Sequence, residues 1–212
     1  MTTPTAVATP YGEGRLVVHP ARRPVATLVL SHGAGNGIEA RDLAALAAAL
    51  PAQGFTVALF EQPWRVAGRK IATAPPTLDV GLRAAVEQLA PRAPFVVGGR
   101  SAGARSAARC ARALGAAGCL ALAFPLHPPG HPERSRVDEL TGAGVPTLVI
   151  QGERDPMGRP EEFPEGIDLA VVPAADHGLK VPKTGPLDQA GALDLVVESA
   201  LEWLVREVTG NP

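Results

Sequence analysis

One stretch in the middle of the chain restricts its fold more than any other: Phe95 to Ala104, which reads FVVGGRSAGA. A short apolar run leads into Gly99-x-Ser101-x-Gly103, and a segment rich in Ala and Arg follows. The stretch therefore predicts a strand, a sharp turn and a helix that continues to Leu114. Glycines on both sides of the serine suit such a turn, because a Cβ at either position would collide with the neighbouring chain.

A serine at this kind of turn has a distinctive chemistry. The strained backbone pushes the hydroxyl of Ser101 clear of the sheet, in the arrangement known as a nucleophile elbow. The N-terminus of the following helix adds partial positive charge, and the backbone N–H of Ala102 can donate to a developing oxyanion. A glycine-flanked serine can also cap an ordinary helix, so the motif takes its meaning from the strand before it and the helix after it.

Length and charge narrow the class of protein and of partner. The 212 residues suit one α/β domain spanning residues 1–212, with an irregular start over 1–14. The 20 Lys and Arg against 21 Asp and Glu give a net charge of −1, so no excess charge attracts nucleic acid or an anionic membrane. No apolar run approaches the ~18 residues of a membrane span, and residues 1–14 lack a signal-peptide pattern. We expect a cytoplasmic protein.

The cysteines and histidines give no sign of a metal. Cys110 and Cys119 both lie in apolar segments, so we expect buried thiols rather than a disulfide. No Cys/His spacing suits zinc, and we expect neither a metal nor a cofactor. The sequence leaves open a homodimer.

Apolar runs and helical patterns alternate along the chain. Short continuous apolar runs predict strands covered on both faces, and apolar positions at helical spacing predict helices. Besides the elbow strand and its helix, we expect strands at 15–19, 25–30, 56–60, 119–124, 145–151 and 168–172, helices at 38–53, 78–90, 133–140 and 193–208, and a loop at 61–76. This order predicts a mostly parallel sheet of about six to seven strands with helices on both faces.

Functional groups gather at the carboxyl ends of the strands in such sheets. The side chains that carry useful chemistry each follow a predicted strand in this sequence: His32, Trp64, Ser101, His127, Asp155 and His177. We therefore expect all of them at one edge of the sheet.

Together these features resemble the α/β-hydrolase superfamily over nearly the whole chain, from about Val25 to Val208. Four segments are similar, more narrowly, to a small dienelactone-hydrolase-like family of predicted serine hydrolases. They are the Ser-His-Gly-Ala-Gly loop at 31–35, the loop at 61–68, the Gly-Gly-Arg-Ser elbow and Leu-His-Pro-Pro-Gly at 126–130. Relatives of that family include non-enzymatic subunits of chromatin complexes.

The resemblance implies a catalytic triad, because Ser101, Asp155 and His177 follow the superfamily's order of nucleophile, acid and base. His177 would take the proton of the serine hydroxyl and return it to the leaving group. Asp155 would hold the imidazole in the right tautomer, with Glu153 and Asp176 as competing carboxylates.

Further candidates line the same loops. The backbone N–H of Ala34 would join that of Ala102 in the oxyanion hole, with Gly33 as the alternative to Ala34. Arg100, beside the nucleophile, would attract an anionic substrate, whereas the arginines of the following helix, Arg105, Arg109 and Arg112, fit a solvated face. The candidates for the substrate pocket are His32, Gly33, Trp64, Arg65, Arg100 and His127.

Departures from other superfamily members limit the chemistry. About twenty residues separate positions 124 and 145, too few for a helical lid, so we expect no lid domain and an open site. Dienelactone hydrolases proper carry cysteine at the elbow, and members that cleave epoxides or carbon–halogen bonds carry aspartate. With Ser101 there, the expected reaction is acyl transfer to water from an ester, a thioester or a related acyl compound.

These features suggest three candidate functions. The first is a serine hydrolase acting on a small-molecule acyl substrate, and the second is a scaffold of the same fold that binds a small molecule or a protein without turnover. The third is a dinucleotide-binding enzyme, since Gly33, Gly35 and Gly37 follow a strand and Glu61 ends the next one. Ile38 stands where G-x-G-x-x-G needs its last glycine, which disfavours this third reading.

Overall fold

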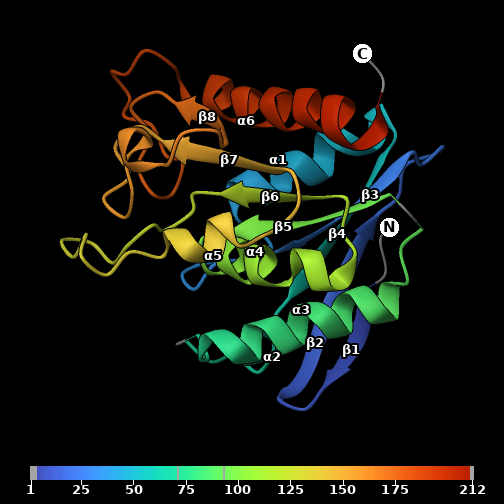
Figure 1. The fold of residues 1–212 in the computed structure, drawn as a ribbon. Coiled ribbons are helices and arrows are strands. Elements are labelled where there is room, and N and C mark those ends of the chain that lie inside the picture. The colour runs from blue at the N-terminus through green and yellow to red at the C-terminus, as the bar shows by residue number, and fades with distance from the viewer. Residues whose placement is uncertain (1–3, 71, 93, 211–212) are drawn as a thin grey trace.

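The computed structural model describes residues 4–70, 72–92 and 94–210. An eight-stranded sheet crosses it, with the strand order β1-β2-β4-β3-β5-β6-β7-β8 (Figure 1). The pairs β1–β2 and β2–β4 are antiparallel, and all later pairs are parallel, which confirms the predicted α/β class. The strands are β1 (Thr5–Thr9), β2 (Gly12–His19), β3 (Ala26–Ser31), β4 (Phe55–Glu61), β5 (Phe95–Arg100), β6 (Gly118–Leu122), β7 (Thr147–Gly152) and β8 (Asp168–Val172).

Helices cover both faces of this sheet, with α1 and α6 on one side and α3, α4 and α5 on the other (Figure 1). The helices are α1 (Arg41–Ala49), α2 (Pro63–Val66), α3 (Pro75–Leu89), α4 (Ala102–Leu114), α5 (Val137–Thr141) and α6 (Gln189–Trp203), with short 3-10 turns at Leu50–Gln53 and Pro160–Glu162 and a π-helical end at Leu204–Thr209.

The central strands are apolar on both sides because both sides are covered. In β3, Leu28 and Leu30 pack in the cluster beneath α1 and α6, whereas Val29 packs in the cluster beneath α3 and α4. All three side chains have no exposed surface. Successive residues of a strand point to opposite faces, so a strand between two helical layers needs an unbroken apolar run.

The N-terminal segment departs from the prediction. We expected residues 1–14 to be irregular, but β1 and the start of β2 form a hairpin at the edge of the sheet, which raises the strand count to eight. Val7 is fully buried and packs with Leu16 and Phe60. Gly12, with a φ of 112°, provides the backbone conformation that the turn requires.

Several helix boundaries also differ from the prediction. The segment 61–76 contains α2, and the helix expected at 133–140 is confined to Val137–Thr141. α6 begins at Gln189, before the expected residue 193, because the side chain of Asp188 accepts a hydrogen bond of 2.8 Å from the backbone N–H of Gly191. The Asp188 cap therefore places the start of α6 before the apolar residues from which the helix was predicted.

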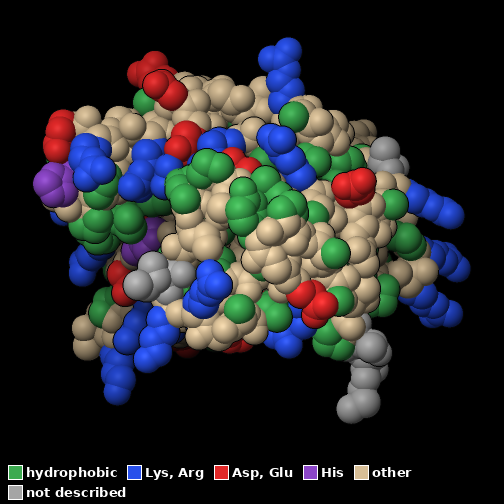
Figure 2. All heavy atoms as spheres, turned by 90° about the horizontal axis from the view of Figure 1, so that it is seen from below, with side chains coloured by type: hydrophobic (Ala, Val, Ile, Leu, Met, Phe, Trp, Pro, Cys, Tyr) green, Lys and Arg blue, Asp and Glu red, His purple; other side chains and the backbone are tan. Residues whose placement is uncertain are grey.

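Charged side chains of both signs lie on the surface. Figure 2 shows basic side chains around the rim of one face with acidic side chains between them, in keeping with a net charge of −1. Within the described residues, no helix combines the length and the apolar composition that a membrane crossing needs.

We predict that Asp188→Ala lowers the free energy of unfolding by about 1 kcal/mol, because it removes the N-terminal cap of α6. Urea unfolding followed by circular dichroism measures this. Asp194→Ala, at an exposed position inside the same helix, is the control and should change stability by less than about 0.5 kcal/mol. Equal effects of the two substitutions would contradict the capping role.

Candidate active site

The turn between β5 and α4 holds Ser101 in an uncommon backbone conformation, with φ 53° and ψ −112°. A non-glycine residue in such a region costs about 1–3 kcal/mol and persists only where the surroundings enforce it. Here a Cβ on Gly99 would lie 2.3 Å from the carbonyl oxygen of Ser31, and one on Gly103 would lie 2.4 Å from the same atom. Both glycines of the motif are therefore needed for the turn to pack against the end of β3.

Three sequence-predicted side chains meet at this turn. The hydroxyl oxygen of Ser101 is 2.9 Å from Nε2 of His177, and Nδ1 of His177 is 2.7 Å from Oδ2 of Asp155. A carboxylate only accepts hydrogen bonds, so the imidazole proton lies on Nδ1, and Nε2 can accept the serine proton. The His177 side chain keeps 24% of its surface exposed, whereas Asp155 is fully buried. The arrangement has an accessible end and an enclosed end.

The carboxylate of Asp155 is held on both oxygens. Oδ1 accepts the backbone N–H of Met157 at 2.8 Å, and Oδ2 also accepts Nε2 of Gln151 at 2.9 Å. The Gln151 amide also donates to the carbonyl oxygen of Gly158 at 2.8 Å. Sequence reasoning missed Gln151, although a polar residue at the end of an apolar strand was a usable signal.

The competing carboxylates have other partners. Oε2 of Glu153 accepts the backbone N–H of Ala174 at 2.5 Å. Oδ1 of Asp176 accepts the backbone N–H groups of Gly178 and Lys180 at 2.7 and 3.0 Å. Both side chains hold the loop that carries His177 through these backbone hydrogen bonds.

The loop after β3 runs directly beside Ser101. A Cβ on Gly33 would lie 3.1 Å from the Cβ of Ser101, so the glycine permits this approach. Nδ1 of His32 is 2.7 Å from the carbonyl oxygen of Gly33, and Nε2 accepts the backbone N–H of Gln62 at 3.0 Å. Because C=O and N–H of a trans peptide point in opposite directions, the N–H of Ala34 faces away from the His32 ring.

His32 is a buried, neutral side chain in this arrangement. Burial lowers the pKa of His32 below its ordinary value, and an Nε2 that accepts a backbone hydrogen bond must carry no proton. The ring of Trp64 packs edge-on against it, with 5.5 Å between ring centres. Trp64 is itself buried, and through His32 it packs against the loop that contains the oxyanion-hole candidate Ala34.

Trp64 also lines a cavity of about 530 Å³ between the β1–β2 turn, α2 and the start of α3. Tyr11 and Arg69 also line it, whereas Ser101 is not among the lining residues. Arg65, predicted for the pocket, lies instead in an ion pair with Glu39 at 3.1 Å. The cavity is therefore next to the loop that flanks Ser101, on the side of the sheet's antiparallel edge.

Arg100 is placed differently from the expectation. It is only 5% exposed, and its Nε lies 3.0 Å from Oδ2 of Asp42, which is fully buried. Its Nη2 donates to the backbone oxygen of His177 at 2.6 Å. Burial raises the pKa of Asp42, although the charge of Arg100 acts in the opposite direction. The charge expected to attract an anionic substrate is thus offset inside the protein.

The arginines of α4 are also more engaged than expected. Arg109 makes a bidentate pair with Asp79 of α3 at 2.8 and 2.7 Å, and it reaches Glu139 of α5 at 2.8 Å. Arg105 pairs with Glu139 as well. These two side chains join three helices, which corrects the prediction of a purely solvated face.

His127 joins two loops near the triad. Its Nε2 is 2.8 Å from Oε2 of Glu162, its Nδ1 is 2.9 Å from the carbonyl oxygen of Pro128, and its backbone N–H donates to Met157 at 3.0 Å. The hydrogen bond to Pro128, and then the bond to Glu162, raise the pKa of His127, against the effect of burial. Both ring nitrogens face acceptors, which fits a protonated ring that ties the loop after β6 to the segment after β7.

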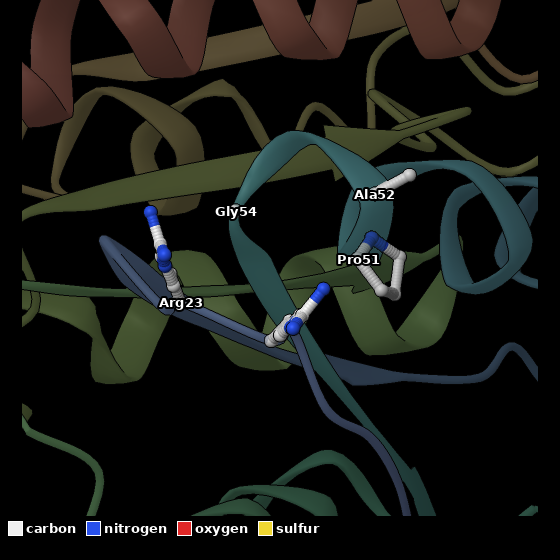
Figure 3. Close-up of a pocket in the computed structure, with 5 residues that line it drawn as sticks. Arg23, Pro51, Ala52 and Gly54 are labelled. Carbon is white, nitrogen blue, oxygen red and sulfur yellow. The ribbon is translucent and has the colours of Figure 1, made fainter.

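A second pocket, of about 380 Å³, lies at the amino-terminal end of β4. Figure 3 shows Arg23, Pro51, Ala52 and Gly54 around it. Gly54 immediately precedes β4, whereas Ser101 follows β5, and these two parallel-running strands place the pocket and the triad at opposite ends. Among the described residues, no group of three or more His, Cys, Asp or Glu side chains is arranged to hold a metal ion.

The sequence matches the family described as the alpha/beta hydrolase domain over residues 24–205. The chain belongs to the α/β-hydrolase family. No curated protein matches the sequence.

Solved structures share this hydrolase's fold at low sequence identity. An alpha-beta serine hydrolase homologue from Coxiella burnetii has a TM-score of 0.72 at 16% identity, over 93% of this chain and 97% of that chain. A serine hydrolase without a lid from Xanthomonas campestris has a TM-score of 0.71 at 20% identity, over 100% and 97%. A dienelactone hydrolase from Anabaena variabilis has a TM-score of 0.71 at 18% identity, over 98% of each chain. The lidless description suits this α/β hydrolase, in which the helix between β6 and β7 is the five-residue α5.

The His127–Glu162 pair predicts a pH-dependent contribution to stability. The raised pKa of His127 adds stability that is lost as pH rises through that pKa, and the lowered pKa of Glu162, caused first by the backbone N–H of Arg159, adds stability that is lost as pH falls through it. The melting-temperature difference between wild type and Glu162→Gln should therefore be larger near pH ~6 than near pH ~9.

Glu161→Gln is the matched control, because Glu161 is exposed and lies 3.9 Å from Arg159 rather than near a histidine. Its melting-temperature difference from wild type should be the same at both pH values. A Glu162→Gln difference that does not change with pH would show that His127 is neutral in the folded protein.

Proposed function

We propose that this α/β hydrolase is a serine hydrolase that cleaves an ester, thioester or related acyl bond of a small-molecule substrate. The observation that carries the proposal is the continuous hydrogen-bonded line from the hydroxyl of Ser101 through His177 to the buried carboxylate of Asp155. A serine hydroxyl is a weak nucleophile at neutral pH, and a positioned base within hydrogen-bond distance is what activates it.

In the first half of the reaction, Oγ of Ser101 attacks the acyl carbon while Nε2 of His177 takes the hydroxyl proton. The carbonyl oxygen becomes an oxyanion, which the backbone N–H groups of Ala102 and Ala34 would stabilise. The intermediate collapses when the bond to the leaving group breaks, and the imidazolium gives its proton to that group. The acyl group is then bonded to Ser101.

In the second half, water replaces the leaving group. His177 takes a proton from the water, the hydroxide oxygen attacks the acyl carbon, and the proton returns to Oγ of Ser101 as the carboxylic acid departs. Asp155 remains ionised throughout and stabilises each imidazolium. The hydrogen bonds from Met157 and Gln151 hold its carboxylate in place against the imidazole.

The openness of the triad supports a small or variable acyl substrate. His177 is partly exposed, and α5 is the short helix between β6 and β7 where many superfamily members carry a lid. Similar folds include the esterase domain of a Rhodothermus marinus protein, with a TM-score of 0.71 at 15% identity. The likeness concerns the fold, and the ester-type reaction is our inference from the triad.

Reaction with a fluorophosphonate tests whether Ser101 is activated. We expect intact-mass analysis to show one adduct on wild type and none on Ser101→Ala. Ser106→Ala, at a buried serine of α4, is the control and should react like wild type. If wild type and both variants are folded and none reacts, the proposal fails and a non-catalytic binding scaffold takes its place.

Steady-state kinetics on a p-nitrophenyl ester test the roles of the triad. Ser101→Ala and His177→Ala should each lower kcat by about 10⁴-fold or more, and Asp155→Asn somewhat less, because the three groups act as a unit. Retention of more than about a tenth of the wild-type kcat by Ser101→Ala would contradict the mechanism.

A further inference from the structure

The side chain of Arg100 connects three parts of the fold. It ends β5 directly before Ser101, its Nε pairs with Asp42 in α1 at 3.0 Å, and its Nη2 donates to the backbone oxygen of His177 at 2.6 Å. One buried guanidinium therefore links the strand of the nucleophile to the loop of the base.

The same guanidinium lies between two glycines of the site. A Cβ on Gly33 would lie 3.5 Å from Nη1, and a Cβ on Gly178 would lie 3.7 Å from Nη2. Gly33 belongs to the loop of the predicted oxyanion donor, and Gly178 follows His177. Arg100 thus packs against both loops that approach Ser101.

The loop that carries His177 is irregular. It lies between β8 and α6, outside the helices and strands, and Ala174 and Leu179 both have positive φ, at 56° and 49°. The backbone N–H groups of Gly178 and Lys180 donate to Oδ1 of Asp176 within the loop, so these bonds set its shape without setting its distance from β5. The backbone N–H of Arg154 donates to the carbonyl oxygen of Ala175 at 2.9 Å and ties the loop to the segment after β7. The bond from Arg100 to the carbonyl oxygen of His177 ties the same loop to β5.

Stability alone does not account for a buried ion pair. Removing two charges from water costs several kcal/mol per ion, and replacing such a pair by apolar residues of similar size is often neutral or stabilising. The planar guanidinium can serve a carboxylate on one side and a carbonyl on another in a fixed geometry, which a lysine cannot do. Its value here is geometric.

We infer that Arg100, held in place by Asp42, is a positioning residue that fixes His177 relative to Ser101 and does not bind substrate. The inference rests on the proposed function and deepens it. It replaces the sequence-based expectation that Arg100 attracts an anionic substrate.

The principal test is the double variant Asp42→Leu/Arg100→Met, which removes both charges and leaves neither partner buried alone. With a neutral p-nitrophenyl ester, we expect kcat to fall by about 100-fold, since a displacement of about 1 Å at the reacting atoms can have that effect. KM should change by less than about threefold, because no substrate contact is lost. The urea unfolding midpoint shows whether the variant remains folded.

Arg100→Lys gives a second, conservative variant. It keeps a positive charge beside Asp42 but loses the planar group that reaches the His177 carbonyl. We expect it to fold and to lose about as much kcat as the double variant. Full activity in Arg100→Lys would show that the charge, and not the link to His177, matters, and would overturn the inference.

The matched control applies the same exchange to another ion pair. Asp79→Leu/Arg109→Met removes a pair of 2.7 Å between α3 and α4 that does not contact the site. It should leave kcat within about twofold of wild type, whatever its effect on stability. A similar loss of kcat in both double variants would mean that the effect is one of general destabilisation, which would overturn the inference.

An anionic p-nitrophenyl ester separates positioning from substrate binding. If Arg100 positions His177, the double variant should lower kcat equally for neutral and anionic esters. If the double variant Asp42→Leu/Arg100→Met raised KM about tenfold for the anionic ester alone, Arg100 would bind a substrate carboxylate, and the inference would be overturned.

Fluorophosphonate labelling separates a failure of the proposed function from a failure of the inference about Arg100. Wild type that does not react at Ser101 would refute the proposed function, and the inference with it. Wild type that reacts, with a double variant that reacts at the same rate, would refute the inference and leave the function standing. We expect reaction in both, at least about tenfold slower in the double variant.

Discussion

The packing of the Ser101 turn against the end of β3 determines the rest of the site. Gly99 and Gly103 bring their backbones so close to the carbonyl of Ser31 that a Cβ on either would overlap it, at 2.3 and 2.4 Å. Because β3 ends at Ser31 and the chain goes directly on to Gly33, the contact that shapes the elbow also brings the oxyanion-hole candidate loop to Ser101. A single close approach between the end of β3 and the Ser101 turn therefore brings the hydroxyl of Ser101 and the candidate backbone donors together.

The sequence could locate the groups whose position follows from the strands. Ser101, Asp155 and His177 each come just after a parallel strand, and parallel strands end at one edge, so their meeting was predictable. The side chains that hold these three residues in place were harder to predict. Asp42 lies on a helix and Gln151 within a strand, and each reaches its partner through a contact that only the folded chain defines. Local patterns predict elements, whereas these hydrogen bonds depend on how the elements pack.

The edges of the fold show the same limit. Central strands reveal themselves as unbroken apolar runs, but β1 is covered on one side only and has one clearly buried side chain, Val7. A strand of that kind carries too weak a pattern to distinguish it from an irregular terminus. Trp64 and Arg65 illustrate the converse, because both follow β4 as predicted, yet one is buried against His32 and the other is paired with Glu39. Position along the chain indicated the right neighbourhood without indicating which way each side chain points.

Charge near the triad is compensated from within. Asp155 faces His177 and the donors of Met157 and Gln151, and the guanidinium of Arg100 faces Asp42. In a buried setting an uncompensated charge would be costly and would shift toward its neutral form, so each charge requires a fixed partner. Fixed partners also fix geometry, because a charge that moves away from its partner loses the interaction that made burial tolerable. The interactions that permit charged groups beneath the site are therefore the same ones that hold His177 at hydrogen-bond distance from Ser101.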